Sequence, residues 1–599
     1  MKIAIGSIRR EFRVAFVVAI VAAAGVIALS RGDHRLGAVL EVAAAALAGA
    51  FYFLAMRPAR IRRNSVLMIR LAGTLREHPP RSPFAHLRGR VAPSLHELRR
   101  ALEFAAQDPN VSAIVVEFAG LQTGLASAEE IHDLLRAAAA GGKRVIALLN
   151  SDSVSVREYV AACGAGEIAA NPNAVLMMVG VAAGSVFLKG ALDKLGIQAQ
   201  TLQWKEYKGA GETFARDGMS PEVRQSLEAI VGDSLEVVVA RISAARKLEP
   251  ARARALAGGG FMSARAAIEA GLVDRGDYIE GLRAQFDPER EDKIFIGLYR
   301  YLRRVSYEEN RTARARLALI HGVGPVIAGE APAAGEFLSG EETAAAIRRA
   351  ARDRRVRAIV FRVNSPGGSA LGSDLVWRAV AEAREMAKPV IVSMGDVAGS
   401  GGYYVAMGAD AIVANAGTLT GSIGVVYASF NLSAMLATIG VRMDIVKTDE
   451  LGDALSMARA MTPEELARLN ATVGELYGNF TAKVGEGRKL DAAQVENMAR
   501  GRVWSGTAAR RGGLVDEIGG FDRAVKIARR HAGLDDSEPH RLVIYAAQGI
   551  LAGLGIGSSR GLEWPLKALA GALAIPAGWT PAIAGLIARG GAILLCPFF

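Results

Sequence analysis

Cysteine is almost missing from this chain of 599 residues, in which only Cys163 and Cys596 occur. Two cysteines exclude a disulfide framework and any zinc site built on cysteine ligands. The eight histidines are scattered, and the sequence has no HExxH motif or other paired-ligand spacing. We therefore expect no metal site and no cofactor.

Acidic residues are fewer than basic ones, which leaves a formal net charge of +12. Part of this excess lies in RPARIRR, residues 57–63, directly after an apolar segment. A basic total is compatible with nucleic-acid binding, but a basic run in this position favours a membrane surface. We expect membrane lipid as a partner and no nucleic acid.

Two apolar segments near the start are close to the length of a membrane span. Residues 14–30 carry no charge and residues 36–56 carry only Glu41, whereas about 20 apolar residues cross the hydrocarbon core. We expect residues 1–60 to be a membrane anchor of one or two spans. A single span places the bulk of the protein across the membrane, and two spans return it to its starting side.

The last segment, residues 541–599, is apolar but repeatedly broken by glycine and proline. Docking on a membrane surface, packing on a partner subunit and burial as a core segment all fit this pattern.

Between these ends the chain repeats itself, which indicates duplication of a whole domain. We expect the first repeat at residues 61–305 and the second at 306–540. The matching pairs are DPNVSAIVVEF with DRRVRAIVFRV, GAGEIAAN with GADAIVAN, MSPE with MTPE, RKL with RKL, and GLVD with GLVD.

Each repeat alternates short apolar strands with segments of helical period, which predicts an α/β fold with parallel pairing. Active sites in such folds lie on loops after the carboxyl ends of the strands. NSPGGS at residues 364–369 and GDVAGSGG at 395–402 occupy such places.

Ser400 in the second of these loops is a candidate nucleophile, although a small residue in a glycine-rich turn is the alternative. A serine needs a base and donors for the oxyanion. Gly367 and Gly368 allow close backbone approach, and Gly401 adds an amide at a helix start. We expect these three glycines to form the oxyanion hole.

No histidine lies near these loops to serve as the base, the nearest in sequence being His321. Asp396 and Asp410 are nearby, but aspartate is a weak base. A lysine can serve when burial leaves its amine neutral.

The differences between the repeats indicate where that lysine is. Ser155 aligns with Ser400, but Val156 and Arg157 replace the two glycines after it. Conversely, Lys208 of the first repeat aligns with Glu450 of the second. This asymmetry predicts a composite site in which Ser400 is the nucleophile and Lys208 is the general base.

The sequence resembles the signal peptide peptidase A family in its long, duplicated form, through RVNSPGGS, GDVAGSGGYYVA, TGSIGV and YKGAGETFARDGMS. The resemblance covers roughly residues 60–540. It implies a tandem duplication of a domain related to crotonase and the Clp protease subunit. It also implies that Ser422 hydrogen-bonds the lysine and orients it.

The resemblance further implies a tetramer that cleaves remnant signal peptides within the membrane. We expect a serine endopeptidase of the bacterial inner membrane, on the periplasmic side by resemblance and on the cytoplasmic side if both segments span. The alternatives are a crotonase-like acyl-CoA hydratase or isomerase, which needs a carboxylate base, and a non-catalytic membrane scaffold with a relic site.

Overall fold

The computed structural model describes residues 61–79, 92–312, 315–332, 335–535 and 538–545. The expected membrane segments at 14–30 and 36–56, and most of the apolar segment 541–599, lie outside these ranges. Within the ranges, no helix has both the length and the apolar character needed to cross a membrane.

The first repeat is built on a parallel sheet of six strands in the order β10-β1-β2-β3-β5-β9. The strands are β1 (Ser65–Thr74), β2 (Val111–Gln122), β3 (Arg144–Leu149), β5 (Glu167–Ala170), β9 (Arg275–Gly276) and β10 (Phe295–Gly297). A small second sheet joins β4 (Val154–Ser155), β6 (Val175–Met178) and β8 (Gly260–Ser263).

The second repeat has the same strand order in its main sheet, β21-β11-β14-β15-β16-β20, and all these pairs are parallel. The strands are β11 (Ala315–Val323), β14 (Val356–Ser365), β15 (Val390–Gly399), β16 (Ala411–Ala414), β20 (Glu517–Ile518) and β21 (His540–Ile544). The end of β15 also pairs with β17 (Leu419–Gly421), which pairs in turn with β19 (Val503–Ser505). Strands β12 (Val326–Ile327) and β13 (Leu338–Ser339) form a short separate pair.

These sheets confirm the predicted mixed α/β class, and the predicted strands of both repeats are present. Each sheet has a buried apolar core of its own. Helix α12 (Leu298–Thr312) links the two sheets, so the expected boundary at residue 305 falls inside this helix. Residues 541–544, expected in the C-terminal segment, are part of β21 and pair with β11.

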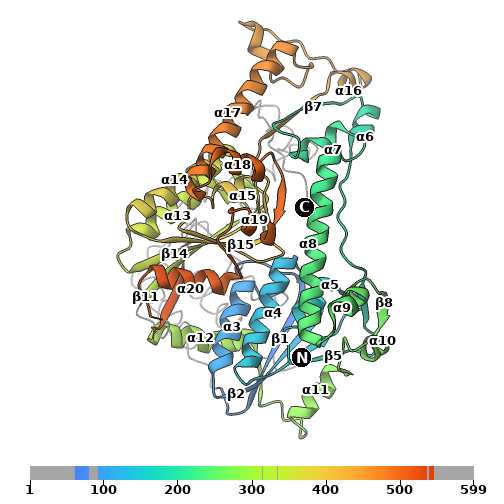
Figure 1. The fold of residues 1–599 in the computed structure, drawn as a ribbon, viewed down its shortest axis with the longest axis vertical. Helices are drawn as coiled ribbons and strands as arrows, with labels where there is room; N and C mark the ends of the chain where they lie inside the picture. The colour runs from blue at the N-terminus through green and yellow to red at the C-terminus, as the bar shows by residue number, and fades with distance from the viewer. Residues whose placement is uncertain (1–60, 80–91, 313–314, 333–334, 536–537, 546–599) are drawn as a thin grey trace, which may run out of the picture.

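Helices cover the sheets of both repeats (Figure 1). Those of the first repeat are α3 (Leu95–Gln107), α4 (Leu125–Ala140), α5 (Val156–Ala162), α6 (Lys189–Lys194), α7 (Glu212–Ala215), α8 (Pro221–Arg246), α9 (Pro250–Ala257), α10 (Ala264–Glu269) and α11 (Ile279–Phe286). Those of the second are α13 (Gly340–Arg352), α14 (Ala370–Glu385), α15 (Gly401–Tyr404), α16 (Ser433–Thr438), α17 (Pro463–Arg488), α18 (Ala492–Met498), α19 (Gly506–Arg511) and α20 (Phe521–His531).

The two longest helices, α8 and α17, begin in the same way. Ser220 and Thr462 are their N-caps, each accepting a hydrogen bond from a backbone amide and each followed by proline at the first helical position. This pattern satisfies an amide that the helix itself leaves unpaired.

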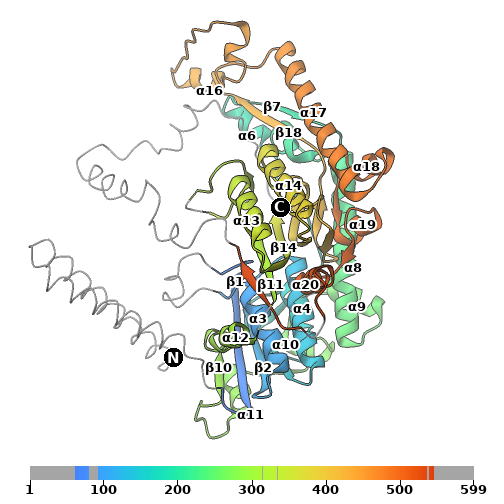
Figure 2. The ribbon, with the colours of Figure 1, turned by 90° about the vertical axis from the view of Figure 1, so that its left-hand side faces the viewer.

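The contacts between the repeats include a strand pair and a buried cluster of charges. Strand β7 (Gln198–Gln203) of the first pairs antiparallel with β18 (Val426–Asn431) of the second, at the top of the view in Figure 1. Lower down, the buried guanidinium of Arg362 donates hydrogen bonds to the carboxylates of Glu77 and Glu130. Figure 2 shows β7 and β18 side by side at the top of the molecule.

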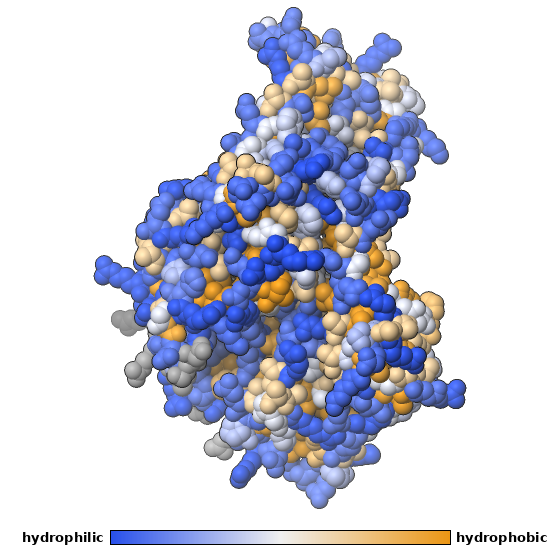
Figure 3. All heavy atoms as spheres, viewed as in Figure 1, coloured by the Kyte–Doolittle hydropathy of each residue, from blue (hydrophilic) through white to orange (hydrophobic). Residues whose placement is uncertain are grey.

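The surface seen in Figure 3 is mainly hydrophilic, with hydrophobic side chains gathered across its middle. Scattered apolar side chains are normal on a protein surface, so a concentration of them is the informative feature.

Candidate active site

Ser400 lies on a sharp turn between the end of β15 and the start of α15. Its backbone has φ 53° and ψ −119°, a conformation that non-glycine residues rarely adopt. Its amide donates to the carbonyl of Gly421 at 2.8 Å, and its side chain makes no capping bond to α15. The turn is strained and leaves the hydroxyl available, as is common at functional sites.

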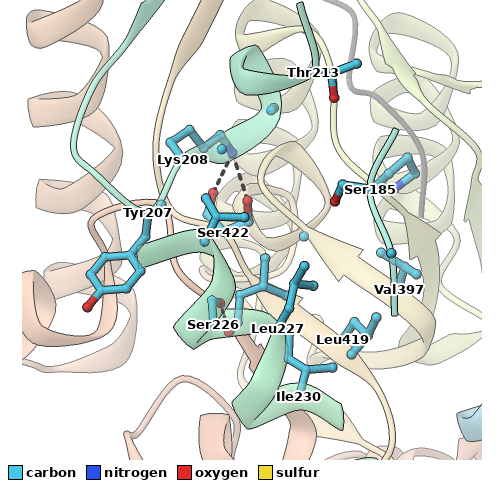
Figure 4. A pocket seen from close by; sticks show the side chains of 18 of the residues that line it. Ser185, Tyr207, Lys208, Thr213, Ser226, Leu227, Ile230, Val397, Leu419 and Ser422 are labelled. Carbon is cyan, nitrogen blue, oxygen red and sulfur yellow. Dashed lines mark hydrogen bonds between the residues drawn. The ribbon is translucent and has the colours of Figure 1, made fainter. Parts of the chain in front are cut away.

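Lys208 approaches this hydroxyl from the first repeat. Its Nζ lies 3.0 Å from Ser400 Oγ, 2.9 Å from Ser422 Oγ and 2.8 Å from the Ser422 carbonyl oxygen. Figure 4 shows Lys208 reaching over Ser422. Lys208 is only 4% exposed. The structure thus brings together the three polar side chains that the sequence predicted.

The contact between the repeats explains how Lys208 reaches this place. Five residues before it, β7 ends against β18, and the Trp204 amide donates to the Val425 carbonyl. Two glycines of the second repeat then leave room for it: a Cβ at Gly501 would lie 2.5 Å from the Lys208 backbone, and one at Gly424 would lie 3.1 Å from Lys208 Cδ. Sequence reasoning missed both glycines, because their role depends on the repeat opposite.

The backbone amides of Gly368 and Gly401 are close to each other, and both glycines line the cavity that Ser400 lines. A Cβ at Gly401 would be 3.1 Å from the Gly368 nitrogen, and within the described residues neither amide has a hydrogen-bond acceptor. Two adjacent amides of this kind suit a developing negative charge.

Gly367 differs from the prediction. Its amide donates to Ser365 Oγ at 3.2 Å, so it is not free for an oxyanion. A Cβ at this position would lie 2.7 Å from Ser400 Cβ, and φ is +102°. Gly367 is therefore needed for close approach of the loop and not as a donor.

Two cavities flank Lys208. One, of about 190 Å³, is lined by Leu227, Ile230, Val397 and Leu419, which gather below Lys208 and Ser422 in Figure 4. The other, of about 460 Å³, contains Ser400, the two oxyanion glycines and the side chains of Leu371 and Phe480. An extended chain crossing Ser400 would meet apolar walls on both sides.

The carboxylates weighed as bases have other partners. Asp396 accepts the amide and hydroxyl of Ser127 at 2.9 and 2.7 Å, and burial raises the pKa of its carboxyl. Asp410 accepts the Val390 amide and the Arg384 side chain, each at 2.8 Å. Neither is hydrogen-bonded to Ser400, so both are structural.

The remaining residues of the sequence analysis lie outside the chemistry. Tyr403 is buried and donates to the Leu514 carbonyl, whereas Glu450 is exposed. His321 is partly buried beside His78 and His96. Among the described residues, no cluster of three or more His, Cys, Asp or Glu could hold a metal ion.

Comparisons with known proteins show the family of this chain. The profile of peptidase family S49 matches residues 137–291 and 382–535, one segment in each repeat. The chain is 30% identical to the chloroplastic serine protease SPPA of Arabidopsis thaliana, over 87% of this chain and 77% of that protein. It is 34% identical to Protease 4 of Salmonella typhi, over 74% of this chain and 72% of that protein.

Among solved structures, ClpP1 from Listeria monocytogenes matches 34% of this chain and 91% of its own, with 13% identity and a TM-score of 0.20. The family match in both repeats and the two long relatives decide the assignment. The chain belongs to peptidase family S49 and is a serine-type peptidase.

Proposed function

We propose that this peptidase cleaves apolar peptides with a Ser400–Lys208 dyad assembled from the two repeats. The 3.0 Å contact between Lys208 Nζ and the hydroxyl of Ser400 is the observation that carries the proposal. The strained backbone of Ser400 and the free amides of Gly368 and Gly401 support it.

The reaction begins when neutral Lys208 takes the Ser400 proton as Oγ attacks the scissile carbonyl carbon. The carbonyl electrons move onto oxygen, and the amides of Gly368 and Gly401 hold that oxyanion. The carbon–nitrogen bond then breaks, and Lys208 gives its proton to the leaving amine. A water, deprotonated by Lys208, attacks the Ser400 ester. The bond between the acyl carbon and Ser400 Oγ then breaks, Lys208 returns the proton to Oγ, and the product leaves as a carboxylic acid that ionises in water.

Ser422 is proposed to orient the base. Its hydroxyl and carbonyl oxygens both lie within 2.9 Å of Lys208 Nζ. They fix the amine beside Ser400 in the way that a third group fixes the base in other hydrolases. Ser422 itself has φ 51°, a conformation that non-glycine residues rarely adopt.

The substrates are proposed to be remnant signal peptides and other apolar peptides. The apolar cavities on both sides of Lys208 support this. We further propose an inner-membrane location through the segment 1–60, with the catalytic repeats on the periplasmic side if one segment spans, and a homo-oligomer. The matching strand orders support descent of both repeats from one crotonase- or Clp-like unit.

The test is hydrolysis of apolar fluorogenic peptides by the full chain in detergent. Ser400→Ala and Lys208→Ala should each reduce kcat at least about 1,000-fold, because each removes one half of the dyad. Unchanged thermal unfolding shows that the variants are folded. Full activity in either variant would reject the dyad.

A further inference from the structure

A third cavity, of about 680 Å³, lies between the repeats and includes the place in the first repeat that corresponds to Ser400. It contains Ser155 and Val156, which align with Ser400 and Gly401. Its other lining is mainly apolar or small, with Met177, Val181, Val231 and Val238 among the apolar residues and Ser234 among the small ones. Two charged residues, Arg157 and Asp396, also line it, and the Asp396 carboxylate accepts hydrogen bonds from Ser127. This cavity is called the vacated cavity below.

The vacated cavity has none of the groups needed for peptide hydrolysis. Ser155 has ordinary φ, −71°, and its hydroxyl accepts the Glu158 amide at 3.1 Å as the cap of α5. The Glu158 carboxylate in turn accepts the amides of Gly120 and Leu121 at 3.1 and 2.9 Å. Both the hydroxyl and these amides are thus engaged.

The cavity has nevertheless not filled in, although protein interiors pack closely and large apolar hollows usually mark binding sites. It adjoins the cavity beside Lys208, because Ile230, Val397 and Leu419 line both. Helix α8 forms the shared wall, and Leu227 and Ile230 on it point into the space shown in Figure 4.

A second wall runs the length of both cavities. Residues 179–183 line the vacated cavity and residues 184–186 line the one beside Lys208. This segment lies in no strand, and within the described residues the backbone of 181–187 makes no hydrogen bond. In Figure 1 it passes alongside α8. A segment whose backbone groups are not hydrogen-bonded can pair with an extended peptide, as the edge strand of a sheet does.

We propose that the vacated cavity is a remote subsite that binds an apolar stretch of the same substrate whose scissile bond lies at Ser400. Eight wall residues are separated by seven steps of about 3.3 Å, or about 23 Å in all, so the substrate needs about seven extended residues on one side of the scissile bond. The inference rests on the proposed function and defines its substrate as a long peptide.

The kinetic test compares a short core peptide with two series of longer peptides. Apolar residues are added at the amino end in one series and at the carboxyl end in the other. One series should gain about tenfold or more in kcat/KM on reaching the vacated cavity, which corresponds to burial of one or two apolar side chains. Ser234→Trp places an indole in the cavity and should abolish this gain while cleavage of the core peptide stays unchanged.

The matched control lies two residues away on α8. Gly232 is exposed and a Cβ there would meet no atom within 4 Å, so Gly232→Trp adds the same side chain facing solvent. This variant should keep the gain with length. The inference is contradicted if neither series gains with length, or if Ser234→Trp leaves the gain intact.

Binding to Ser400→Ala separates this inference from the proposed function. A fluorescein-labelled long peptide should bind Ser400→Ala about tenfold more tightly than the labelled core, and adding Ser234→Trp should remove the difference. Failure to hydrolyse any peptide rejects the proposed function alone. Equal binding of the two peptides to Ser400→Ala rejects the remote subsite. The remote subsite is also rejected if Ser234→Trp changes only the oligomeric state, because the surface would then be a contact with a second copy of this chain.

Discussion

The amine of Lys208 and the hydroxyl of Ser400 lie 3.0 Å apart although 192 positions separate them in the sequence. One belongs to the first repeat and the other to the second, and the β7–β18 pair joins the two repeats a few residues before Lys208. The site therefore exists only when the two repeats are docked, and anything that shifts one against the other will alter activity before it unfolds either.

The orienting role of Ser422 can be tested by removing its hydroxyl. Ser422→Ala should lower kcat about 10- to 100-fold with little change in KM, because the amine keeps one contact but loses the other. Steady-state kinetics on an apolar peptide measures both constants. Ser226→Ala, which lines the same cavity and whose hydroxyl donates to the Val503 carbonyl, is the control. Equal kcat values in the two variants would contradict the role.

The close approach of Gly501 to Lys208 gives a second test. Gly501→Ala should reduce kcat/KM by about 100-fold or more, since its Cβ would lie 2.5 Å from the Lys208 backbone and φ is +83°. Gly218→Ala, where a Cβ meets nothing within 4 Å, should behave as the parent. An active Gly501→Ala would show that the lysine does not need this close approach.

Much of this arrangement could be predicted from the sequence, because duplication makes the chain its own comparison. Glu450 replaces Lys208 in the second repeat, and Val156 replaces the glycine after Ser400 in the first. These two differences indicate the dyad from the sequence alone. The strands were equally readable from their apolar runs.

What the sequence could not predict depends on the contact between the repeats. Gly501 and Gly424 sit in a repeat that carries no base, and only the folded structure shows that they face Lys208. The Gly367 donor was expected from its place in NSPGGS, but the neighbouring Ser365 hydroxyl takes its amide. The local sequence pattern does not reveal which of two adjacent backbone amides is left without a hydrogen-bond acceptor in the folded loop.

The buried charges between the repeats should matter for stability. Arg362 is buried and pairs with Glu77 and Glu130 at 2.9 and 2.7 Å. Arg362→Met leaves two buried carboxylates without their cation and should lower the free energy of unfolding by about 3–5 kcal/mol. Urea unfolding measures this. Arg265→Met, at a side chain 90% exposed, should show no measurable change. A similarly small effect of Arg362→Met would mean that the cluster contributes nothing to docking.

The same cluster predicts a pH dependence. Burial raises the pKa of Glu130 to about 7, from an ordinary value near 4.5. Folding thus favours the protonated form, and the stability that this group contributes is present below pH 4.5 and is lost as pH rises toward 7. Glu130→Gln cannot lose this proton, so its stability relative to the parent should increase between pH 4.5 and 7. If the stability of Glu130→Gln relative to the parent is constant with pH, or falls as pH rises, the raised pKa of Glu130 is contradicted.

The rate at which a fluorophosphonate probe labels the full chain tests the dyad most directly, because the probe needs an activated serine but no particular peptide. The parent should be labelled at Ser400, Ser400→Ala should not be labelled, and Lys208→Met should react at least about 100-fold more slowly while unfolding at the same temperature. Labelling of Lys208→Met at the parent rate, or labelling of a serine other than Ser400, would contradict the account.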